Sequence, residues 1–316
     1  MSRGVVAVTG ATGFLGRHLV RILAADGWRV RVLARRDVVG SDWTGLEPQV
    51  VIGGLGDRPA LARLCADAVV VVHVAGLIKA PSRAQFDSIN VEGTKAVAQA
   101  AATAGSRVIM VSSLAAREPT LSDYAASKRA GEDAARAVIG EALTIVRPPA
   151  IYGPGDMETL ELFRVAQASP WLPVLDPRAR LALVHVEDAA RQISDLVGRW
   201  RPGTFALSDV RTDGYSWRDV MTAAADAVGR KTRLQRIPDS VITAIAQLSG
   251  ALSLAAQTNS IFTSGKAREM LHLDWSLSAG EAVPEALAPR YDIQSGFTQS
   301  VCWYRSNGFL LSPARQ

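Results

Sequence analysis

Tyr124 and Lys128 have the spacing that most directly suggests chemistry in this 316-residue chain. At positions i and i+4 of a helix, the two side chains lie one turn apart on the same face. A phenol with a pKa of about 10 is a poor acid-base group at neutral pH, but a neighbouring ammonium stabilises the phenolate. The pair therefore predicts a proton-transfer group, although a solvated pair on a helix surface has the same spacing.

Two serines follow the apolar run Arg107–Val111, which reads as a buried strand. Ser112 and Ser113 therefore come directly after a strand end, where a hydroxyl group can donate a hydrogen bond to a substrate oxygen. Such a hydroxyl group could polarise a carbonyl or alcohol oxygen while Tyr124 transfers the proton of that oxygen.

A glycine-rich turn directly follows the first apolar run, Val5–Thr9. Gly10 permits the tight turn, Gly13 lets the backbone approach a pyrophosphate, and Gly16 packs the next helix against the strand. Because the turn opens a helix at the first strand–helix junction, it predicts a dinucleotide-binding site. An ordinary strand–helix turn is the alternative interpretation.

The glycine spacing, the strand-end serines and the Tyr–Lys pair together resemble the extended and atypical short-chain dehydrogenases/reductases. This superfamily includes NAD-dependent epimerases/dehydratases and 3β-hydroxysteroid dehydrogenase-like enzymes. Three further segments resemble its landmarks: His73–Gly76, Asn90–Thr94 and Arg147–Asp156. The resemblance covers nearly all of the cofactor core and weakens beyond about residue 190.

The resemblance implies hydride transfer between a nicotinamide and a carbonyl or alcohol carbon, with Tyr124 transferring the proton of the oxygen. It also implies the roles of the catalytic residues. Ser113, the second serine of the pair, is the expected catalytic serine and Ser112 its structural neighbour. Lys128 is expected to hold the cofactor ribose and to lower the pKa of Tyr124. The predicted catalytic residues are thus Ser113, Tyr124 and Lys128.

The end of the second apolar run bears on the choice of cofactor. Ala34 occupies the place where an acidic residue would bind the ribose of NAD(H), and Arg35 follows it. A 2′-phosphate thus loses a repulsion and gains a cationic partner, so NADP(H) is favoured over NAD(H). Gly54 stands where the family often has an adenine-binding Asp. The predicted cofactor-binding residues are Gly10, Thr12, Gly13, Phe14, Leu15, Gly16, Arg35, Arg36, Gly54, Leu55, Ala75, Gly76, Asn90, Tyr124, Lys128, Pro149, Ala150 and Ile151.

Alternating strands and helices must position these residues. The pattern predicts an α/β fold of the Rossmann type, with a doubly wound parallel sheet and a smaller C-terminal substrate lobe. We expect residues 1–205 to form the core, with a lobe segment at about 152–178 inserted, and residues 206–316 to form a mainly helical lobe. The run Leu181–Val186 is a further strand that could rejoin the core. The other predicted strands are Val5–Thr9, Val30–Leu33, Val50–Ile52, Val69–Val74, Arg107–Val111 and Leu143–Val146, and the helical patterns are Leu15–Ala25, Phe86–Ala104 and Ser122–Ile139.

Composition excludes several other classes of protein. The formal charge of +5 comes from scattered Lys and Arg without a basic run, so nucleic acid is not an expected partner. Two cysteines without a CxxC pattern and four dispersed histidines predict neither a disulfide framework nor a metal site. The N-terminus lacks the pattern of a signal peptide, which favours a cytoplasmic location.

The residues after the serine pair narrow the reaction class. Leu114 and Ala115 cannot exchange protons, which disfavours the sugar-nucleotide 4,6-dehydratases. Arg35 favours a net reductase because NADPH is a reductant. A nucleotide-sugar epimerase or reductase is the first alternative, and a non-catalytic dinucleotide-binding accessory subunit is the second.

A stretch without charged residues, 240–265, is the unusual feature of the expected lobe. Its first part, Val241–Ala256, reads as a helix that is too short to span a bilayer. A buried lobe helix and an apolar lid or membrane-facing element are both compatible with it. The lobe resembles those of lipid-acting members, including bacterial 3-ketosphingolipid or ketoceramide reductases, which implies a hydrophobic ketone substrate. Peripheral contact with the inner face of the membrane and a homodimer are compatible with this resemblance.

Overall fold

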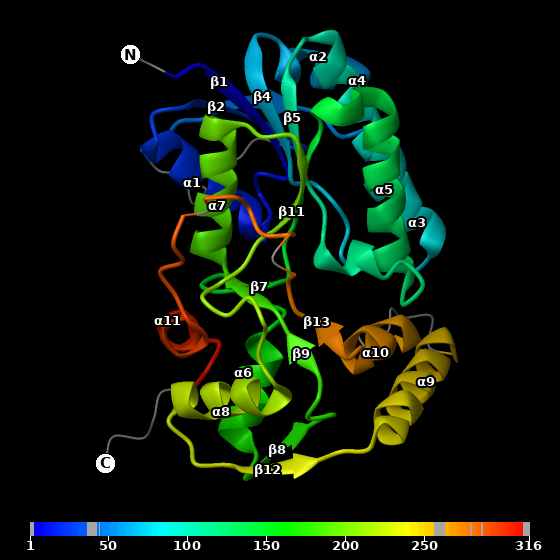
Figure 1. Ribbon diagram of the computed structural model, residues 1–316, viewed down its shortest axis with the longest axis vertical. Helices are drawn as coiled ribbons and strands as arrows, with labels where there is room; N and C mark the ends of the chain where they lie inside the picture. Colours follow the sequence, from blue (N-terminus) through cyan, green and yellow to red (C-terminus); the bar gives the residue numbers. More distant parts are fainter. Residues whose placement is uncertain are drawn as a thin grey trace. The chain divides into compact units, whose positions relative to one another are not determined.

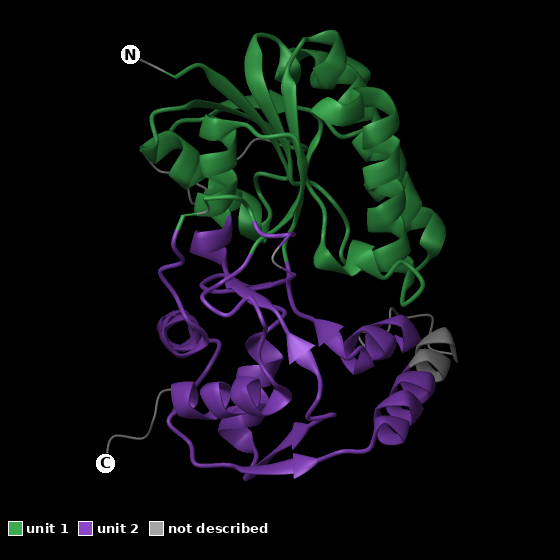
Figure 2. Ribbon diagram, viewed as in Figure 1, with its two compact units in different colours: residues 1–148, 190–207, 283–287 green, residues 149–189, 208–282, 288–316 purple. Residues whose placement is uncertain are grey.

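The computed structural model describes residues 3–36, 43, 45–255, 263–278, 280–285 and 287–311, with the side chains of 250–255 left out. The chain divides into two compact units, coloured separately in Figure 2. Unit 1 contains residues 1–148, 190–207 and 283–287, and unit 2 contains 149–189, 208–282 and 288–316. The sequence predicts the inserted segment at about 152–178, whereas the corresponding stretch of unit 2 is 149–189.

Unit 1 is built on a seven-stranded parallel sheet with the order β11-β6-β5-β4-β1-β2-β3. The central strands are nearly uninterrupted apolar runs, as expected for strands that are buried on both faces. The predicted α/β Rossmann-type fold class is confirmed. The strands are β1 (Val5–Thr9), β2 (Arg29–Ala34), β3 (Gln49–Ile52), β4 (Ala68–His73), β5 (Arg107–Val111), β6 (Thr144–Arg147) and β11 (Gly203–Ala206).

Helices cover both faces of this sheet (Figure 1). On one face, α2 (Arg58–Cys65), α4 (Thr94–Thr103) and α5 (Asp123–Ile139) bury an apolar cluster against the strands. On the other face lie α1 (Phe14–Ala25) and α7 (Val186–Arg199). Gly10 and Arg35 directly follow β1 and β2, and Ser113 lies two residues after β5. These positions are at the carboxyl ends of the strands, where ligands bind in open α/β sheets.

The predicted helix Phe86–Ala104 is divided into three parts. It comprises α3 (Arg83–Asp87), the π-helix η1 (Ser88–Gly93) and α4. In η1 the residues Asn90 and Gly93 are buried, and a Cβ on Gly93 would lie 2.8 Å from Cδ1 of Leu55. π-helical turns occur frequently at functional sites, and no pattern of apolar residues marked this one.

The expectation that Leu181–Val186 rejoins the core sheet is wrong. β10 (Leu183–His185) pairs instead with β7 (Ala150–Tyr152) in unit 2, and β9 (Arg180–Leu181) pairs with β13 (Asp274–Trp275). The seventh strand of the core is β11, which pairs in parallel with β6. β11 (Gly203–Ala206) was not predicted from sequence because it is only four residues long, begins with a glycine and contains a single large apolar side chain, Phe205.

Unit 2 combines short strands with helices around an aromatic core. The ring of Phe297 lies 5.0 Å, edge-on, from both Tyr152 and Phe163. The remaining elements of unit 2 among the described residues are α6 (Leu160–Ala168), β8 (Trp171–Val174), α8 (Trp217–Val228), β12 (Arg233–Arg236), α9 (Asp239–Ala255), α10 (Ser264–Leu271) and α11 (Ile293–Ser306).

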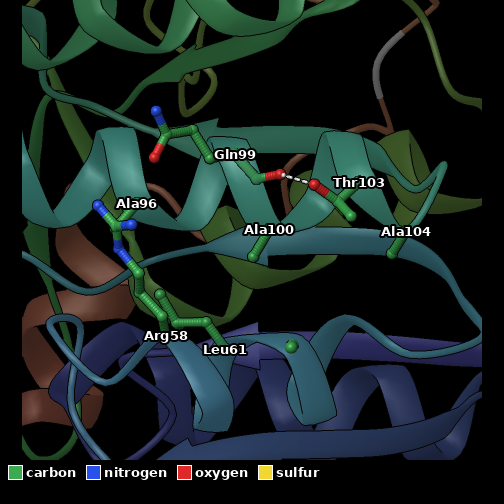
Figure 3. Close-up of a pocket in the computed structure, with 8 residues that line it drawn as sticks. Arg58, Leu61, Ala96, Gln99, Ala100, Thr103 and Ala104 are labelled. Atoms are coloured by element: carbon green, nitrogen blue, oxygen red, sulfur yellow. Dashed lines mark hydrogen bonds between the residues drawn. The ribbon is translucent and has the colours of Figure 1, made fainter.

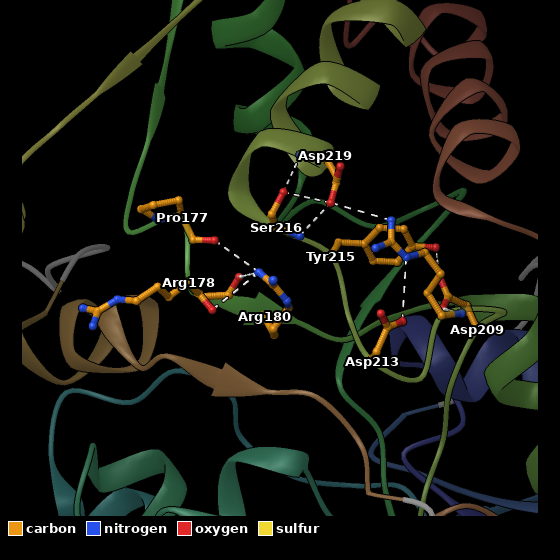
Figure 4. A network of polar contacts seen from close by, with 10 residues as sticks. Pro177, Arg178, Arg180, Asp209, Asp213, Tyr215, Ser216 and Asp219 are labelled. Atoms are coloured by element: carbon orange, nitrogen blue, oxygen red, sulfur yellow. Dashed lines mark hydrogen bonds and ion pairs between the residues drawn. The ribbon is translucent and has the colours of Figure 1, made fainter.

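A polar network fixes the loop that leads into α8 (Figure 4). The hydroxyl of Tyr215 donates a hydrogen bond to Oδ2 of Asp209 at 2.6 Å. The Arg211 guanidinium lies 4.7 Å from the centroid of the Tyr215 ring and 3.6 Å from the carboxylate of Asp219. Burial raises the pKa of Asp209 to about 6. Asp219 also completes a capping box with Ser216, so the network anchors the start of α8.

Candidate active site

The glycine-rich turn has a shape that only glycines allow. Gly10 has φ +71°, and a Cβ there would lie 2.5 Å from the backbone nitrogen of Ala75. A Cβ on Gly16 would collide with the carbonyl oxygen of Gly10. The turn is closed by a hydrogen bond from the amide of Gly13 to Gly10 O at 3.0 Å. Glycine at positions 10 and 16 is therefore required for β1, the loop after β4 and α1 to lie this close together.

The turn leaves the N-terminus of α1 suited to an anion. Its N-cap residue, Gly13, provides no side-chain cap, and no acidic residue lies in the first turn. Thr12 and Gly13 are exposed. The free backbone N–H groups and the positive end of the helix dipole thus lie at an exposed position at the strand ends. This arrangement fits the pyrophosphate of a dinucleotide. Phe14 is half-buried, and Leu15 and Gly16 are buried in the same turn.

The end of β2 has no acidic side chain. Ala34 is buried as its last residue, and Arg35 and Arg36 follow as exposed side chains. After β3, Gly54 has open space where a Cβ would lie, while the side chain of Leu55 contacts Gly93. The cationic pair fits a phosphate at this strand end.

A buried hydrogen-bond chain joins the ends of β1 and β4 to η1. Thr94 Oγ1 donates to the carbonyl oxygen of Asn90 at 2.8 Å and lies 2.9 Å from His73 Nε2. His73 Nε2 must therefore donate to Thr94, so its Nδ1 accepts from Thr9 Oγ1 at 2.7 Å. Thr9 Oγ1 in turn accepts from the amide of Ala75 at 3.3 Å. Burial, aided by the nearby Lys128 charge, lowers the pKa of His73 to about 3 and keeps the imidazole neutral.

Asn90 holds the loop after β4. Its side-chain amide donates to Leu77 O at 3.0 Å and to Ser127 Oγ at 2.9 Å, and its oxygen accepts from the amide of Leu77 at 2.8 Å. Both N–H donors of Asn90 are thus used within the protein. A Cβ on Gly76 would lie 3.1 Å from the Asn90 oxygen, so this small residue brings the loop against Asn90.

Lys128 is buried beneath the same loop. Its Nζ donates to the carbonyl oxygen of Val111 at 3.0 Å, which ties α5 to the end of β5. Burial lowers the pKa of Lys128 to about 8, against the opposing influence of Glu132. Tyr124 is half-buried one turn earlier on α5, with its ring centroid 6.1 Å from that of Phe86.

The two serines at the end of β5 have different surroundings. Ser113 is half-buried and caps the short helix η2 (Leu114–Arg117), accepting from the amide of Ala115 at 3.2 Å. That bond uses an oxygen lone pair, so the Ser113 hydroxyl hydrogen can still be donated. The hydroxyl of Ser112 is buried and has no hydrogen-bond partner among the described residues.

An ion pair that we did not predict lies one turn beyond Lys128. Glu132 is fully buried, and Arg147, at the end of β6, donates to its two oxygens at 2.8 Å and 2.6 Å. The spacing from Tyr124 through Lys128 to Glu132 could have indicated an inward-facing stripe. Arg147, however, is brought to it only by the pairing of β6 with β5.

The structure brings Ser113, Tyr124 and Lys128 to one end of unit 1, with the glycine-rich turn at the same strand ends. The remaining predicted cofactor-binding residues belong to unit 2. Among these, Pro149 is buried, and Ala150 and Ile151 form the exposed and half-buried start of β7.

A cavity of about 410 Å³ lies elsewhere in unit 1, between α2 and α4 (Figure 3). Leu61, Ala100 and Thr103 help to line it, and none of the predicted site residues does. It is therefore separate from the strand-end site.

Two other kinds of feature are absent from the described part of the chain. No helix there is long and apolar enough to cross a membrane. No group of three or more His, Cys, Asp or Glu residues there could hold a metal ion.

A seven-stranded Rossmann-type sheet with a glycine-rich turn, a strand-end serine and a Tyr–Lys pair defines an NAD(P)-dependent oxidoreductase of the extended short-chain dehydrogenase/reductase type. The chain belongs to the NAD dependent epimerase/dehydratase family, whose profile matches residues 6–199. The predicted family and the predicted enzyme class are thereby confirmed.

Individual relatives extend this similarity over the whole chain. It is 55% identical to the ceramide reductase of Caulobacter vibrioides (strain NA1000 / CB15N) over 98% of this chain and 97% of that protein. It is 28% identical to the mitochondrial NADH dehydrogenase [ubiquinone] 1 alpha subcomplex subunit 9 of Dictyostelium discoideum, over 73% of this chain and 65% of that protein. The crystal structure of gox2253 superposes with a TM-score of 0.79 and 25% identity, over 97% of this chain and 99% of that one.

Proposed function

We propose that this chain reduces the ketone of a sphingolipid, such as a ketoceramide, with NADPH. The observation that carries the substrate class is the 55% identity, over nearly the full length, to a ceramide reductase. The intact set of Ser113, Tyr124 and Lys128 supports catalysis by this chain itself.

In the proposed reaction, a hydride forms a C–H bond at the ketone carbon while Tyr124 donates its proton to the oxygen, which yields a secondary alcohol. Bound NADPH supplies the hydride. Ser113 donates a hydrogen bond to the carbonyl oxygen. Lys128 binds the cofactor ribose and stabilises the phenolate that Tyr124 becomes. His73, through Thr9, and Asn90 hold the loop after β4, beneath which Lys128 is buried.

The preference for NADPH rests on the end of β2. Exposed Arg35 follows a residue without a carboxylate, which suits a 2′-phosphate. The amide groups at the N-terminus of α1 would hold the pyrophosphate, and the backbone of Gly54, Leu55 and Ala75 would border the adenosine half. We propose that the backbone of Pro149–Ile151 borders the nicotinamide.

The experiment is to incubate purified protein with a ketoceramide and NADPH, and to follow both NADPH oxidation and formation of the reduced lipid by mass spectrometry. Tyr124→Phe should lower turnover by about 100-fold or more, because it removes the proton donor. It should leave NADPH binding unchanged by fluorescence. Full turnover in this variant would refute the mechanism.

The same experiment separates the alternatives. A nucleotide-sugar epimerase would retain tightly bound NAD and consume no NADPH during turnover. An accessory subunit, the alternative supported by the similarity to the Dictyostelium subunit, would bind the dinucleotide without reducing any ketone of a broad panel. Stoichiometric loss of NADPH with reduced lipid as product supports the proposed reductase.

A further inference from the structure

An apolar stripe runs along the exposed side of α9, beside the exposed polar residues Thr243 and Gln247. Val241, Ile245 and Leu248 are 41%, 52% and 63% exposed, and they follow one another at the i, i+4, i+7 spacing of a single helix face. The neighbouring face is buried through Ile242 and Ala246. The apolar stripe therefore belongs to the surface and is additional to the face that α9 needs for packing.

The buried face of α9 connects this stripe to the two-stranded sheet of β12 and β8. Ile242 packs with Leu175 and Ile237, the residues that directly follow β8 and β12. The amide of Ile237 also donates to Val174 O at 3.0 Å. The apolar stripe and the end of the sheet thus adjoin within unit 2, and the chain runs from β12 directly into α9 (Figure 1).

The outward side of that sheet carries an exposed aromatic ring and cations. Trp171 is 52% exposed and is paired in register with Arg233, so both side chains lie on the same face. Their neighbours Leu172 and Leu234 point inward and contribute to the core. Arg230 and Lys231, in the turn before β12, are exposed as well.

Cations outnumber acids in the segment that leads from the end of α8 into α9. Residues 230–249 contain Arg230, Lys231, Arg233 and Arg236 but a single acid, Asp239, and Arg236 lies 4.0 Å from the carboxylate of Asp176. This surface combines an apolar helix face, a half-exposed tryptophan and several cations. Such a combination is typical of proteins that bind the interface of an anionic bilayer. The apolar side chains enter the headgroup boundary, tryptophan lies at its level, and the cations meet lipid phosphates.

We propose that the surface formed by Trp171, Lys231, Arg233 and the Val241–Ile245–Leu248 stripe of α9 docks on an anionic phospholipid bilayer. This deepens the proposed function, because a sphingolipid ketone resides in a membrane. The docking itself requires neither cofactor nor substrate.

The test is flotation of the purified full-length chain with vesicles, without cofactor or substrate. Vesicles of phosphatidylcholine mixed with phosphatidylglycerol should bind the protein, vesicles of phosphatidylcholine alone should bind it more weakly, and added salt should weaken the binding. Lys231→Gln and Arg233→Gln should each lower the partition coefficient about fivefold. The triple variant Val241→Ser/Ile245→Ser/Leu248→Ser should lower it on the order of tenfold or more.

Matched controls change the same residue types outside this surface. Leu311→Ser alters a leucine that is 77% exposed, and Arg58→Gln alters an exposed cation at the start of α2. Neither should change vesicle binding. All variants should retain the wild-type melting temperature, since none of the substituted side chains belongs to an apolar core.

Three outcomes would overturn the inference: no binding by the wild type, equal binding to both kinds of vesicle, or unchanged binding in the patch variants. A change of oligomeric state in the triple variant would assign the stripe to a second copy of the chain instead. Vesicle binding without ketoceramide reduction would refute the proposed function alone, and reduction without vesicle binding would refute the docking alone.

Discussion

At the scale of single residues, the adjacent serines at the end of β5 offer a matched pair of variants. Ser113→Ala removes the proposed donor to the ketone oxygen and should lower kcat/KM about 100-fold, as for loss of one oxyanion donor. Ser112→Ala removes a buried hydroxyl without a described partner and should leave kcat/KM within about twofold, with equal or higher stability. Steady-state kinetics of both variants check the assignment, and the reverse order would assign catalysis to Ser112.

The buried ammonium of Lys128 makes stability depend on pH. Its pKa is about 8 in the folded chain, against an ordinary value of 10.5, because burial penalises the charge. Between these values the unfolded chain binds more protons, so the contribution of Lys128 to stability rises with pH from 8 to 10.5. Lys128→Met lacks this contribution. The difference in unfolding free energy, wild type minus variant, should increase across that window in urea titrations, and a flat difference would contradict it.

The candidate-site residues that could be predicted from sequence are those whose neighbours in the structure are also close along the chain. Tyr124 and Lys128 share one helix, and Ser113 directly follows a strand, so periodicity and a family motif indicate them. Glu132 with Arg147 could not be predicted, because their contact depends on the register of β6 beside β5. His73 was noted only as part of a motif, and its partners Thr9 and Thr94 come from two other elements. The catalytic and binding roles stay predictions.

At the scale of elements, the close approach of α5 to η1 depends on Gly131. A Cβ at this position would collide with the carbonyl oxygen of Asn90. Gly131→Ala should therefore lower the unfolding free energy by about 1–3 kcal/mol in urea titrations, as overpacking does. Gly198→Ala on α7 is the control. Its new methyl group would meet nothing within 4 Å, so helix propensity should raise stability by about 0.5–1 kcal/mol. Equal effects of the two changes would argue against the contact.

The sequence predicted the elements of the cofactor core better than those of the lobe. Six core strands were predicted within two residues at either end, because buried parallel strands are continuous apolar runs. The π-helix η1 was not predicted, because the apolar pattern of residues 86–104 reads as one continuous helix. The predicted helix Val241–Ala256 corresponds to α9 as far as Ala255, and Ala256 and the stretch up to residue 262 lie outside the described residues.

At the scale of the whole molecule, bound cofactor should raise stability according to its affinity. NADPH should therefore raise the melting temperature more than an equal concentration of NADH. Arg35→Ser should remove most of that difference, since a charge-assisted hydrogen bond to the 2′-phosphate contributes about 1.5–3 kcal/mol. Arg36→Ser, the adjacent exposed cation, is the control and should have a smaller effect. Equal increases in melting temperature with NADPH and NADH in the wild type would show that Arg35 does not discriminate between the two cofactors.

The order of strands in unit 1 also has a consequence for the newly made chain. β6 is finished at Arg147, but its outer neighbour β11 begins only at Gly203, after the 149–189 segment of unit 2. Until residue 206 has left the ribosome, the free backbone groups of β6 form an open sheet edge that can pair with other strands. Part of unit 2 must therefore be synthesised before unit 1 can add β11 and complete its seven-stranded sheet.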